Sequence, residues 1–310
     1  MKRIKKINFL STFIPFIGLV LSILLNPLYS QEINRQNQNL IFCFVGDTGS
    51  VTEVQSVVAK SLSNSDCNFV WHTGDIIYPS GISSSEDPRL RTNFLDPFKE
   101  VFNKKIPFIL TLGNHDYKQH PAAYLKVAQS NPLIIHPNNY FTKSYGGVCF
   151  FALDTTVFDK LYLFHKRKVQ INWLISKMDS LKKDCKLSIS VGHHPLFSSG
   201  DRKKGTPQLV KFLNKYVFGV VDLYISGHNH VLADEGERDG TVQLISGTGS
   251  LPGGSSKKEL KGRFNKEIPG YLRISLHVEN QEIIAEYQFI ASKSKQILWS
   301  NSKKGEGIRK

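Results

Sequence analysis

Short apolar runs recur along the chain, and most of them end abruptly at a glycine or a charged residue. Runs of four to eight apolar residues bounded by turn residues are typical of buried strands. Open α/β sheets hold their functional groups in the turns at the carboxyl ends of such strands. We therefore predict strands over Leu40–Val45, the apolar start of Phe69–Tyr78, Ile106–Leu112, Val148–Leu153, Leu187–Val191 and Val220–Ile225.

Between these strands, apolar residues recur every three or four positions, which is the spacing of a helix with one buried face. Thr52 and Gln55 fit a capping box, so the first helix is predicted to begin near Thr52. Loops are predicted over Ser80–Asp87 and Asn131–Lys143. Further helices are predicted over Leu90–Phe102 (broken at Pro97), Pro121–Gln129, Gln170–Leu181 and Gln208–Val217.

Three later strands, Val242–Ser246, Tyr271–Val278 and Ile283–Phe289, have no helices between them. We expect them to pair antiparallel in a second sheet, because parallel strands need long crossover connections. Alternating strands and helices followed by strands alone predict an α/β sandwich. The chain has no repeat, so we expect one domain over residues 40–300, a polar linker over 31–39 and a mobile basic tail over 301–310.

The first thirty residues have the composition of an export signal. Four of the first six residues are basic, the mostly apolar stretch Ile7–Leu25 follows, and Ser30 supplies a small residue at the end. An uncleaved membrane anchor is the alternative, because roughly 17–25 apolar residues can span a bilayer. Polar residues and Pro15 within the stretch favour a cleaved signal peptide over residues 1–30. The mature protein is then expected in the periplasm or secreted.

The chain is basic, with a formal net charge of +14. Removing residues 1–30 takes away four basic residues, which leaves 36 basic and 26 acidic residues and a net charge of +10. Such a protein attracts anionic substrates and surfaces. The lysines and arginines are scattered and lack interleaved aromatic residues, so we expect no nucleic-acid groove. The four cysteines could form two disulfides or remain as free buried thiols, and the sequence does not decide between these alternatives: Cys43, Cys67, Cys149 and Cys185.

Polar residues able to bind metals follow five of the predicted strands, each close to a glycine. Any one of them alone would more often be a turn or core residue. Together they form a ligand set for two adjacent metal ions of intermediate to hard character, and such a pair can clamp both the attacking and the leaving oxygens of a phosphoryl group. The set comprises Asp47, Asp75, Tyr78, Asn114, His193, His228 and His230.

The same five clusters carry a resemblance to a known family. They read Gly46-Asp47-Thr48-Gly49, Gly74-Asp75-Ile76-Ile77-Tyr78, Gly113-Asn114-His115-Asp116, Gly192-His193 and Gly227-His228-Asn229-His230. The chain closely resembles the purple acid phosphatases, in particular the small tartrate-resistant type, within the calcineurin-like metallophosphoesterase superfamily. The resemblance covers nearly the whole mature chain. It implies a four-layer α/β/β/α sandwich of two mixed sheets flanked by helices.

The resemblance implies a ferric site held by Asp47, Tyr78 and His230. Most members of the superfamily have Asp-x-His in the first motif, where this chain has Asp47-Thr48-Gly49. Tyr78 would replace the missing imidazole, and a phenolate is a hard donor that favours Fe(III). A trivalent ion is expected to lower the pKa of bound water below the value of about 7 reached on catalytic zinc. Activity in acid follows as an expectation.

The resemblance also implies a second metal site and a proton donor. Asn114, His193 and His228 would hold a divalent iron, zinc or manganese ion, and Asp75 would bridge the two ions. His115 would bind the substrate phosphate or protonate the leaving alkoxide, with Asp116 orienting it. General acids of this kind typically contribute about 10²–10⁴ in rate.

The function implied by the resemblance is an exported acid phosphatase that hydrolyses phosphate monoesters by attack of a metal-bound hydroxide. Small phosphorylated compounds are the expected substrates, with phosphoproteins as a further candidate, and we expect a monomer. A phosphodiesterase or nucleotide-pyrophosphate hydrolase using the same metals is the alternative enzyme. A non-catalytic metal- or polyanion-binding surface protein is the more distant alternative. A membrane would be a partner only if the signal stayed uncleaved.

Two positions depart from the family pattern. His194 stands where mammalian relatives carry a tyrosine, and we expect it to pack behind the ligands, with substrate contact as the alternative. Thr155–Lys168 is short where animal members carry a protease-sensitive loop, so regulation by cleavage is not expected. The remaining histidines match no motif and are expected to be ordinary surface or core residues: His72, His120, His136, His165 and His277.

Overall fold

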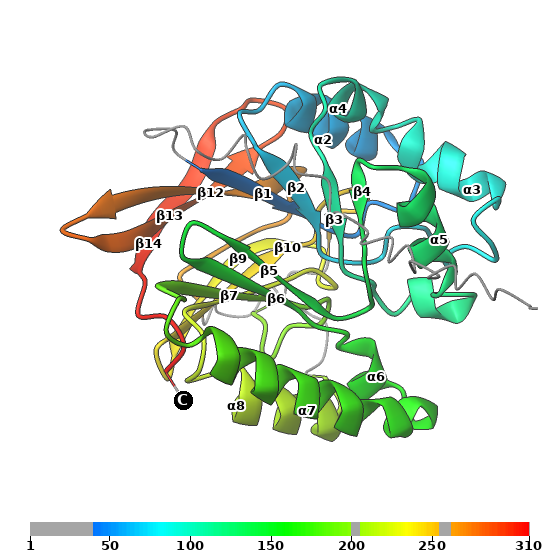
Figure 1. The fold of residues 1–310 in the computed structure, drawn as a ribbon. Coiled ribbons are helices and arrows are strands. Elements are labelled where there is room, and N and C mark those ends of the chain that lie inside the picture. Colours follow the sequence, from blue (N-terminus) through cyan, green and yellow to red (C-terminus); the bar gives the residue numbers. More distant parts are fainter. Residues whose placement is uncertain (1–39, 200–204, 254–261, 310) are drawn as a thin grey trace, which may run out of the picture. The chain divides into compact units, whose positions relative to one another are not determined.

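Two seven-stranded mixed sheets lie face to face at the centre of the fold, shown in Figure 1. This computed structural model describes residues 40–199, 205–253 and 262–309, which all lie within one unit, Asn39–Lys310. The predicted signal peptide over 1–30 and linker over 31–39 lie outside the described residues.

The first sheet combines parallel strands from the start of the chain with antiparallel strands from its end. β1 to β4 run parallel to one another, and β12 pairs antiparallel with β1. Across the sheet the order is β14 (Ile297–Lys304), β13 (Glu282–Ala291), β12 (Gly270–Glu279), β1 (Ile41–Val45), β2 (Phe69–His72), β3 (Phe108–Leu110) and β4 (Ile134–Ile135).

The second sheet is built around the parallel strands β6, β7, β8 and β10. β5, β9 and β11 pair antiparallel at its two sides. Its order is β11 (Phe264–Lys266), β9 (Leu232–Arg238), β10 (Thr241–Ser246), β8 (Leu223–Ser226), β7 (Leu187–Val191), β6 (Val148–Ala152) and β5 (Phe141–Tyr145).

Helices cover the outer faces of the two sheets, one group on each side (Figure 1). The first sheet carries α2 (Glu53–Ser63), α3 (Pro88–Leu90), a π-helical turn (Arg91–Leu95), α4 (Lys99–Asn103) and α5 (Ala123–Ser130). The second sheet carries α6 (Thr156–Asp159), a 3-10 turn (Leu161–Leu163), α7 (Phe164–Leu181) and α8 (Pro207–Tyr216). The predicted four-layer α/β/β/α sandwich is confirmed.

The core between the sheets is largely aromatic. Phe42, Phe69, Trp71 and Phe150 are buried there and pack on one another, some stacked and some edge-on, with ring centroids 4.6–6.2 Å apart. Trp71 donates its indole N–H to Thr111 Oγ1 at 2.9 Å, so the one polar atom of this ring is satisfied. These residues alternate with side chains that face the helices, as expected for strands covered on both faces.

Most predicted helices are confirmed, with details that the residue pattern did not reveal. Thr52 caps α2 by accepting from the Gln55 N–H at 3.2 Å. The Gln55 side chain does not complete the capping box, because it donates instead to the carbonyls of Thr48 and Asn93. The predicted helix over residues 90–102 is broken near Pro97, as expected. Among the described residues, no helix is both long and apolar enough to cross a membrane.

Three expectations about strands and loops are wrong. The late strands do not form a sheet of their own, because β10 joins the second sheet while β12 and β13 extend the first. The predicted loop over 131–143 contains β4 and the start of β5. The predicted basic tail over 301–310 is not a tail. β14 continues to Lys304, and Arg309 pairs with the buried carboxylate of Asp222.

The four cysteines form two disulfides, Cys43–Cys67 and Cys149–Cys185. The first joins β1 to the turn before β2, and the second joins β6 to the turn after α7. Each disulfide therefore closes a loop within one half of the sandwich.

Candidate metal centre

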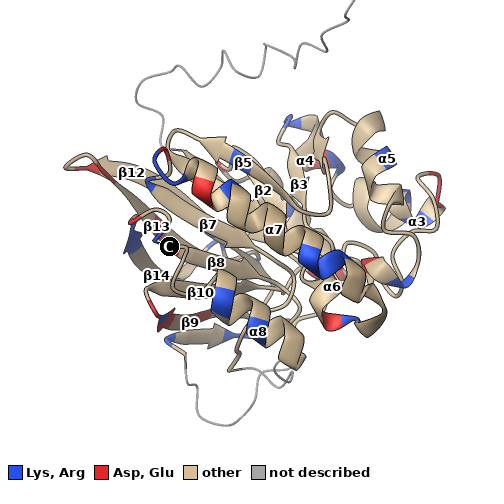
Figure 2. Ribbon diagram, turned by 60° about the horizontal axis from the view of Figure 1, so that its bottom comes forward, with Lys and Arg blue, Asp and Glu red and all other residues tan. Residues whose placement is uncertain are grey.

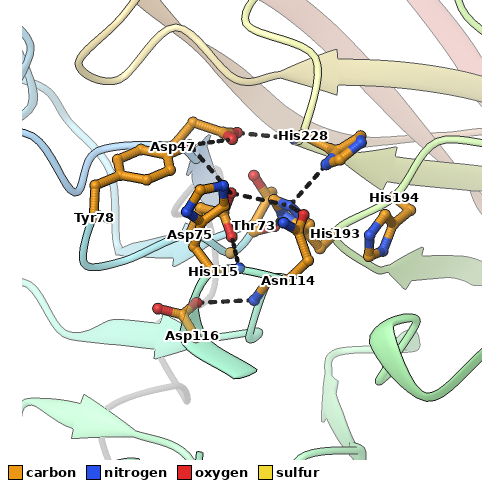
Figure 3. A network of polar contacts seen from close by, with 12 residues as sticks. Asp47, Thr73, Asp75, Tyr78, Asn114, His115, Asp116, His193, His194 and His228 are labelled. Carbon is orange, nitrogen blue, oxygen red and sulfur yellow. Dashed lines mark hydrogen bonds and ion pairs between the residues drawn. The ribbon is translucent and has the colours of Figure 1, made fainter. Parts of the chain in front are cut away.

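The predicted donor residues lie together at one end of the two sheets (Figure 3). β1, β2 and β3 of the first sheet lead into the turns that carry Asp47, Asp75 and Asn114. β7 and β8 of the second sheet lead into the turns that carry His193 and His228. The site is thus shared by both sheets, and packing of the sandwich is what brings its two halves together.

Tight turns at the strand ends aim these side chains into the site. Asp47, Asp75 and His228 adopt positive φ angles of 58°, 57° and 68°, a conformation that costs energy in residues other than glycine. Gly113 allows two of these turns to approach closely, because a Cβ atom there would overlap the Asp75 carboxylate and the ring of His193. Backbone strain of this kind clusters at functional sites, and here it orients the donors.

One group of donors surrounds the Tyr78 hydroxyl. This oxygen lies 3.0 Å from Asp47 Oδ1, 3.1 Å from Asp75 Oδ2 and 3.1 Å from His230 Nε2. His230 Nε2 also lies 3.3 Å from Asp47 Oδ1. Four donor atoms from three separate turns therefore converge on one point.

A second group surrounds His193 Nε2. This nitrogen lies 3.1 Å from Asn114 Oδ1, 3.2 Å from His228 Nδ1 and 3.4 Å from Asp75 Oδ2. The carbonyl of Thr73 accepts from His193 Nδ1 at 3.0 Å, which leaves Nε2 free of a proton in the neutral ring. Asp75 Oδ2 touches both groups, so the Asp75 side chain lies between them.

The electrostatics of the site centre on two buried carboxylates. Burial opposes ionisation of Asp75, but the charge and hydrogen bond of a protonated His193 outweigh it, so in the absence of a metal the pKa of Asp75 lies below its ordinary value. Burial also opposes ionisation of Asp47, which His230 outweighs in the same way, so the pKa of Asp47 is lowered. Burial raises the pKa of the Tyr78 phenol far above 10, and Asp47 and Asp75 raise it further.

This donor set fits a pair of bound cations better than it fits a structural hydrogen-bond cluster. Two buried carboxylates within reach of the same phenol repel each other, and buried charges are normally paired or bound to metals. The nitrogen and oxygen donors exclude the thiolate sites of structural zinc. Asp47, Asp75 and His193 alone already offer ligand atoms within 4.8 Å of one another.

His115 and Asp116 occupy different surroundings. The Pro79 carbonyl accepts from His115 Nδ1 at 2.7 Å, so the Nε2 atom is turned toward the site, 4.0 Å from Asp75 Oδ2. The His115 ring packs edge-on against Tyr78, and burial lowers its pKa. Asp116 was expected to orient this ring. Among the described residues it makes no hydrogen bond to His115 and instead accepts the backbone N–H groups of Ile76, Ile77 and Gly113.

Two histidines outside the predicted ligand set belong to the site's surroundings. His72 accepts the Gly74 N–H on Nδ1 at 3.1 Å and therefore donates Nε2–H to Thr48 Oγ1 at 2.8 Å. It thus joins the first two donor turns, a role that no motif signalled. His194 is buried as expected, with Nδ1 2.9 Å from Thr155 Oγ1, and its ring lies 4.6 Å from that of His228.

A cavity of about 420 Å³ adjoins the donor groups. Asn114, His194 and His228 form its inner wall, and Asp159, Lys160 and Thr206 form part of its outer wall. Concave sites next to convergent polar groups are where ligands usually bind. The sequence did not single out Asp159, Lys160 or Thr206 as part of the site, because nothing in their local pattern marks them as neighbours of His228.

Comparison with known proteins agrees with this geometry. Residues 40–232 match the calcineurin-like phosphoesterase family. The chain belongs to this family. It is 25% identical to tartrate-resistant acid phosphatase type 5 of Rattus norvegicus over 319 residues, which cover 93% of each chain. It is 28% identical to purple acid phosphatase 3 of Arabidopsis thaliana over 284 residues, covering 81% of this chain and 74% of that one.

Solved structures show the same fold. GAP50, the anchor in the inner membrane complex of Plasmodium, superposes with a TM-score of 0.71 at 25% identity and covers 88% of this chain and 90% of its own. A dimetal phosphatase from Danio rerio superposes with a TM-score of 0.54 at 11% identity, covering 86% of this chain and 99% of its own. The predicted resemblance to the purple acid phosphatases is confirmed, and the chain is a metallophosphoesterase with a candidate metal site of buried His and Asp residues.

Proposed function

We propose that this protein is an exported acid phosphatase that hydrolyses phosphate monoesters at a dinuclear centre of Fe(III) and a divalent ion. The observation that carries the proposal is the convergence of seven donor side chains into two groups that share Asp75. Similarity to acid phosphatases along most of the chain supports it. The two disulfides support export, because disulfides persist mainly in oxidising compartments.

The two groups correspond to the two proposed metal sites. Asp47, Tyr78 and His230 would hold Fe(III), and the divalent ion would be held by Asn114, His193 and His228. Asp75 would bridge the two ions. When bound, such a pair of ions supplies Lewis acidity toward the phosphoryl group and lowers the pKa of water. A highly charged cation suits Tyr78 in particular, because the phenol keeps its proton beside two carboxylates unless a cation replaces it.

His115 is the proposed contact to substrate. Its Nδ1–H is held by the Pro79 carbonyl, so Nε2 is the atom available to bind a phosphate oxygen or to protonate the leaving alkoxide. The cavity lined by Asn114, His194 and Lys160 would receive the alcohol part of the substrate.

A visible absorption spectrum combined with metal analysis tests the metal assignment. We expect a tyrosinate-to-Fe(III) absorption band in the wild type and none in Tyr78→Phe. Tyr140→Phe, a partly exposed tyrosine outside the site, serves as the matched control and should keep the band. A colourless, iron-free and fully active wild type would refute the ferric site.

Substrate comparison tests the reaction class. We expect a phosphate monoester to be hydrolysed much faster than a diester or a nucleotide pyrophosphate, with activity greatest in acid. Preference for the diester or pyrophosphate would favour the alternative enzyme on the same donors. Absence of metal-dependent turnover on all three substrates would favour a non-catalytic metal- or polyanion-binding protein.

A further inference from the structure

Large apolar side chains are exposed along the start of α7. Leu161 is 75% exposed, Tyr162 65%, Phe164 66% and Val169 60%, and Ile175 farther along the helix is 49% exposed. Only four other large apolar side chains among the described residues are similarly exposed, and they are spread over distant segments: Val51, Leu251, Val278 and Ile297. An exposed apolar cluster of this kind usually marks an interaction site. We call residues 160–169 the α7 entry segment.

The same layer of helices has a larger net positive charge than the helix layer on the first sheet. Residues 156–186 and 207–216, which form the layer on the second sheet, include ten basic and three acidic residues, a net charge of +7. The layer on the first sheet, residues 53–66, 80–105 and 117–130, has eight basic and six acidic residues, a net charge of +2. In Figure 2, basic positions gather where α7 begins near α6 and occur again on α8.

The basic residues at the start of α7 are unfavourable for the stability of the helix itself. Lys166, Arg167 and Lys168 lie in the first turns, and the first turn has no acidic residue. Cations there are disfavoured by the helix dipole, whose positive end is the N-terminus. No aspartate or glutamate occurs between Lys160 and Met178. The clustering of basic residues is therefore not explained by the helix itself.

The entry segment is held in place rather than loosely attached. Arg167 donates to the carbonyls of Val157 at 2.8 Å and Lys160 at 3.2 Å, which ties the start of α7 to α6. Leu163 is buried in the core beneath the segment. The exposed side chains on either side of Leu163 consequently point outward from a fixed backbone.

We propose that the α7 entry segment docks the protein on an anionic phospholipid bilayer. Leu161, Tyr162 and Phe164 would enter the boundary between headgroups and acyl chains, while Lys166 and Lys168 would contact lipid phosphates. Aromatic and aliphatic side chains beside lysines are the composition of segments that lie in the membrane interface. An anionic bilayer matches both features of this surface, its positive charge and its apolar tips, whereas nucleic acid would match only the charge.

Docking in this way would also orient the candidate active site. Lys160 belongs both to the entry segment and to the wall of the cavity beside Asn114 and His228. The cavity would then lie close to the lipid surface. The docking proposal stands on exposure and charge alone and does not depend on the proposed phosphatase activity.

Vesicle sedimentation tests the proposal with a chain that begins at Gln31, which keeps the whole unit Asn39–Lys310. We expect binding to vesicles of phosphatidylcholine and phosphatidylserine and little binding to phosphatidylcholine alone. Replacing Leu161, Tyr162 and Phe164 together by serine should weaken binding about a hundredfold, because three apolar side chains no longer insert. Lys166→Gln with Lys168→Gln should weaken it about 25-fold, about a factor of five for each charge.

Matched controls keep the test decisive. Val278→Ser with Ile297→Ser removes two exposed apolar side chains elsewhere, and Lys99→Gln with Lys104→Gln removes two exposed charges from the other helix layer. Both should bind vesicles like the wild type, and all variants should unfold at the wild-type temperature. The proposal is overturned if the wild type ignores both vesicle types, if the serine variant binds as well as the wild type, or if the substitutions only dissociate a dimer.

Discussion

The buried carboxylate of Asp116 accepts several hydrogen bonds. Its oxygens accept the N–H groups of Ile76, Ile77 and Gly113 and the hydroxyl of Tyr124. Burial and, to a smaller extent, the nearby Asp75 carboxylate raise the pKa of Asp116 to about 7. Asp116 therefore positions the turns that carry Asp75 and Asn114, and its contribution to the site passes through the backbone.

Replacing Asp116 by asparagine should lower stability. The amide offers one acceptor oxygen in place of two, so at least one buried N–H group loses its partner, at a cost of about 1–3 kcal/mol. We expect urea unfolding to show this loss for Asp116→Asn. His115→Asn, which changes a partly exposed side chain one position away, should change the free energy of unfolding by less than about 0.5 kcal/mol. Equal stability of both variants would show that Asp116 does not hold the turns.

Asp154 gives the protein a pH dependence that is separate from the metal donors. It is buried, it accepts from the Tyr117 hydroxyl, and burial raises its pKa to about 6. The unfolded chain releases this proton near pH 4. Between about pH 4 and pH 6 the folded state thus binds more protons than the unfolded state, and its stability falls as the pH rises through that window.

The Asp154→Asn variant isolates this contribution. From pH 5 to pH 7.5 the wild type should lose about 1 kcal/mol of unfolding free energy that the variant does not lose. Urea unfolding curves of the two proteins at both pH values measure the difference. Parallel behaviour of the two proteins would mean that Asp154 is ionised throughout this range.

At the scale of elements, the end of the chain is part of the folded structure and is not a basic tail. β14 pairs with β13, and the residues after it fold against the buried side chain of Asp222. Asp222 accepts from the backbone N–H groups of Glu306 and Gly307 and pairs with Arg309 at 3.0 Å. Burial raises the pKa of Asp222, so the arginine and these donors are what favour its ionised form.

Removing Arg309 should therefore be costly. Arg309→Ala leaves Asp222 buried without its cation, and breaking a buried pair by removing one partner costs up to about 3–5 kcal/mol. Because the Arg309 side chain is partly exposed, we expect about 2 kcal/mol in urea unfolding. Arg238→Ala, which removes an exposed arginine beside Asp239, is the control and should have little effect. A loss below about 0.5 kcal/mol for Arg309→Ala would refute this role.

At the scale of the whole molecule, the two disulfides and the aromatic core stabilise different parts of the fold. Each disulfide closes a loop within one half of the sandwich, with sequence separations of 24 and 36 residues. The aromatic residues around Trp71 hold the two sheets together without a covalent link. The candidate metal ligands come from both sheets, so their arrangement depends on this core more than on the disulfides.

Removing one disulfide should cost stability without emptying the site. Loops of these lengths correspond to about 3–4 kcal/mol each in the chain-entropy account. We expect Cys43→Ala with Cys67→Ala, and separately Cys149→Ala with Cys185→Ala, to lower the free energy of unfolding by this amount while bound metal stays at the wild-type level. Loss of metal from a variant that remains folded would contradict the separation of tasks.

The sequence by itself determined which residues end the strands and which donors they carry. Apolar runs followed by glycine and a polar donor are local signals, and Asp47, Asp75, Asn114, His193 and His228 could all be found in this way. The alternation of these runs with amphipathic helices was enough for the fold class, because period and turn residues act over short distances.

Only the tertiary structure decided which segments meet. The late strands divide between both sheets, and the last residues of the chain cover Asp222, because pairing and burial depend on partners far away in the sequence. The backbone partners of Asp116, the bonds that join His72 to Thr48, and the exposed start of α7 have the same origin. A residue's type fixes what it can bind, whereas packing of the sheets fixes what lies within its reach.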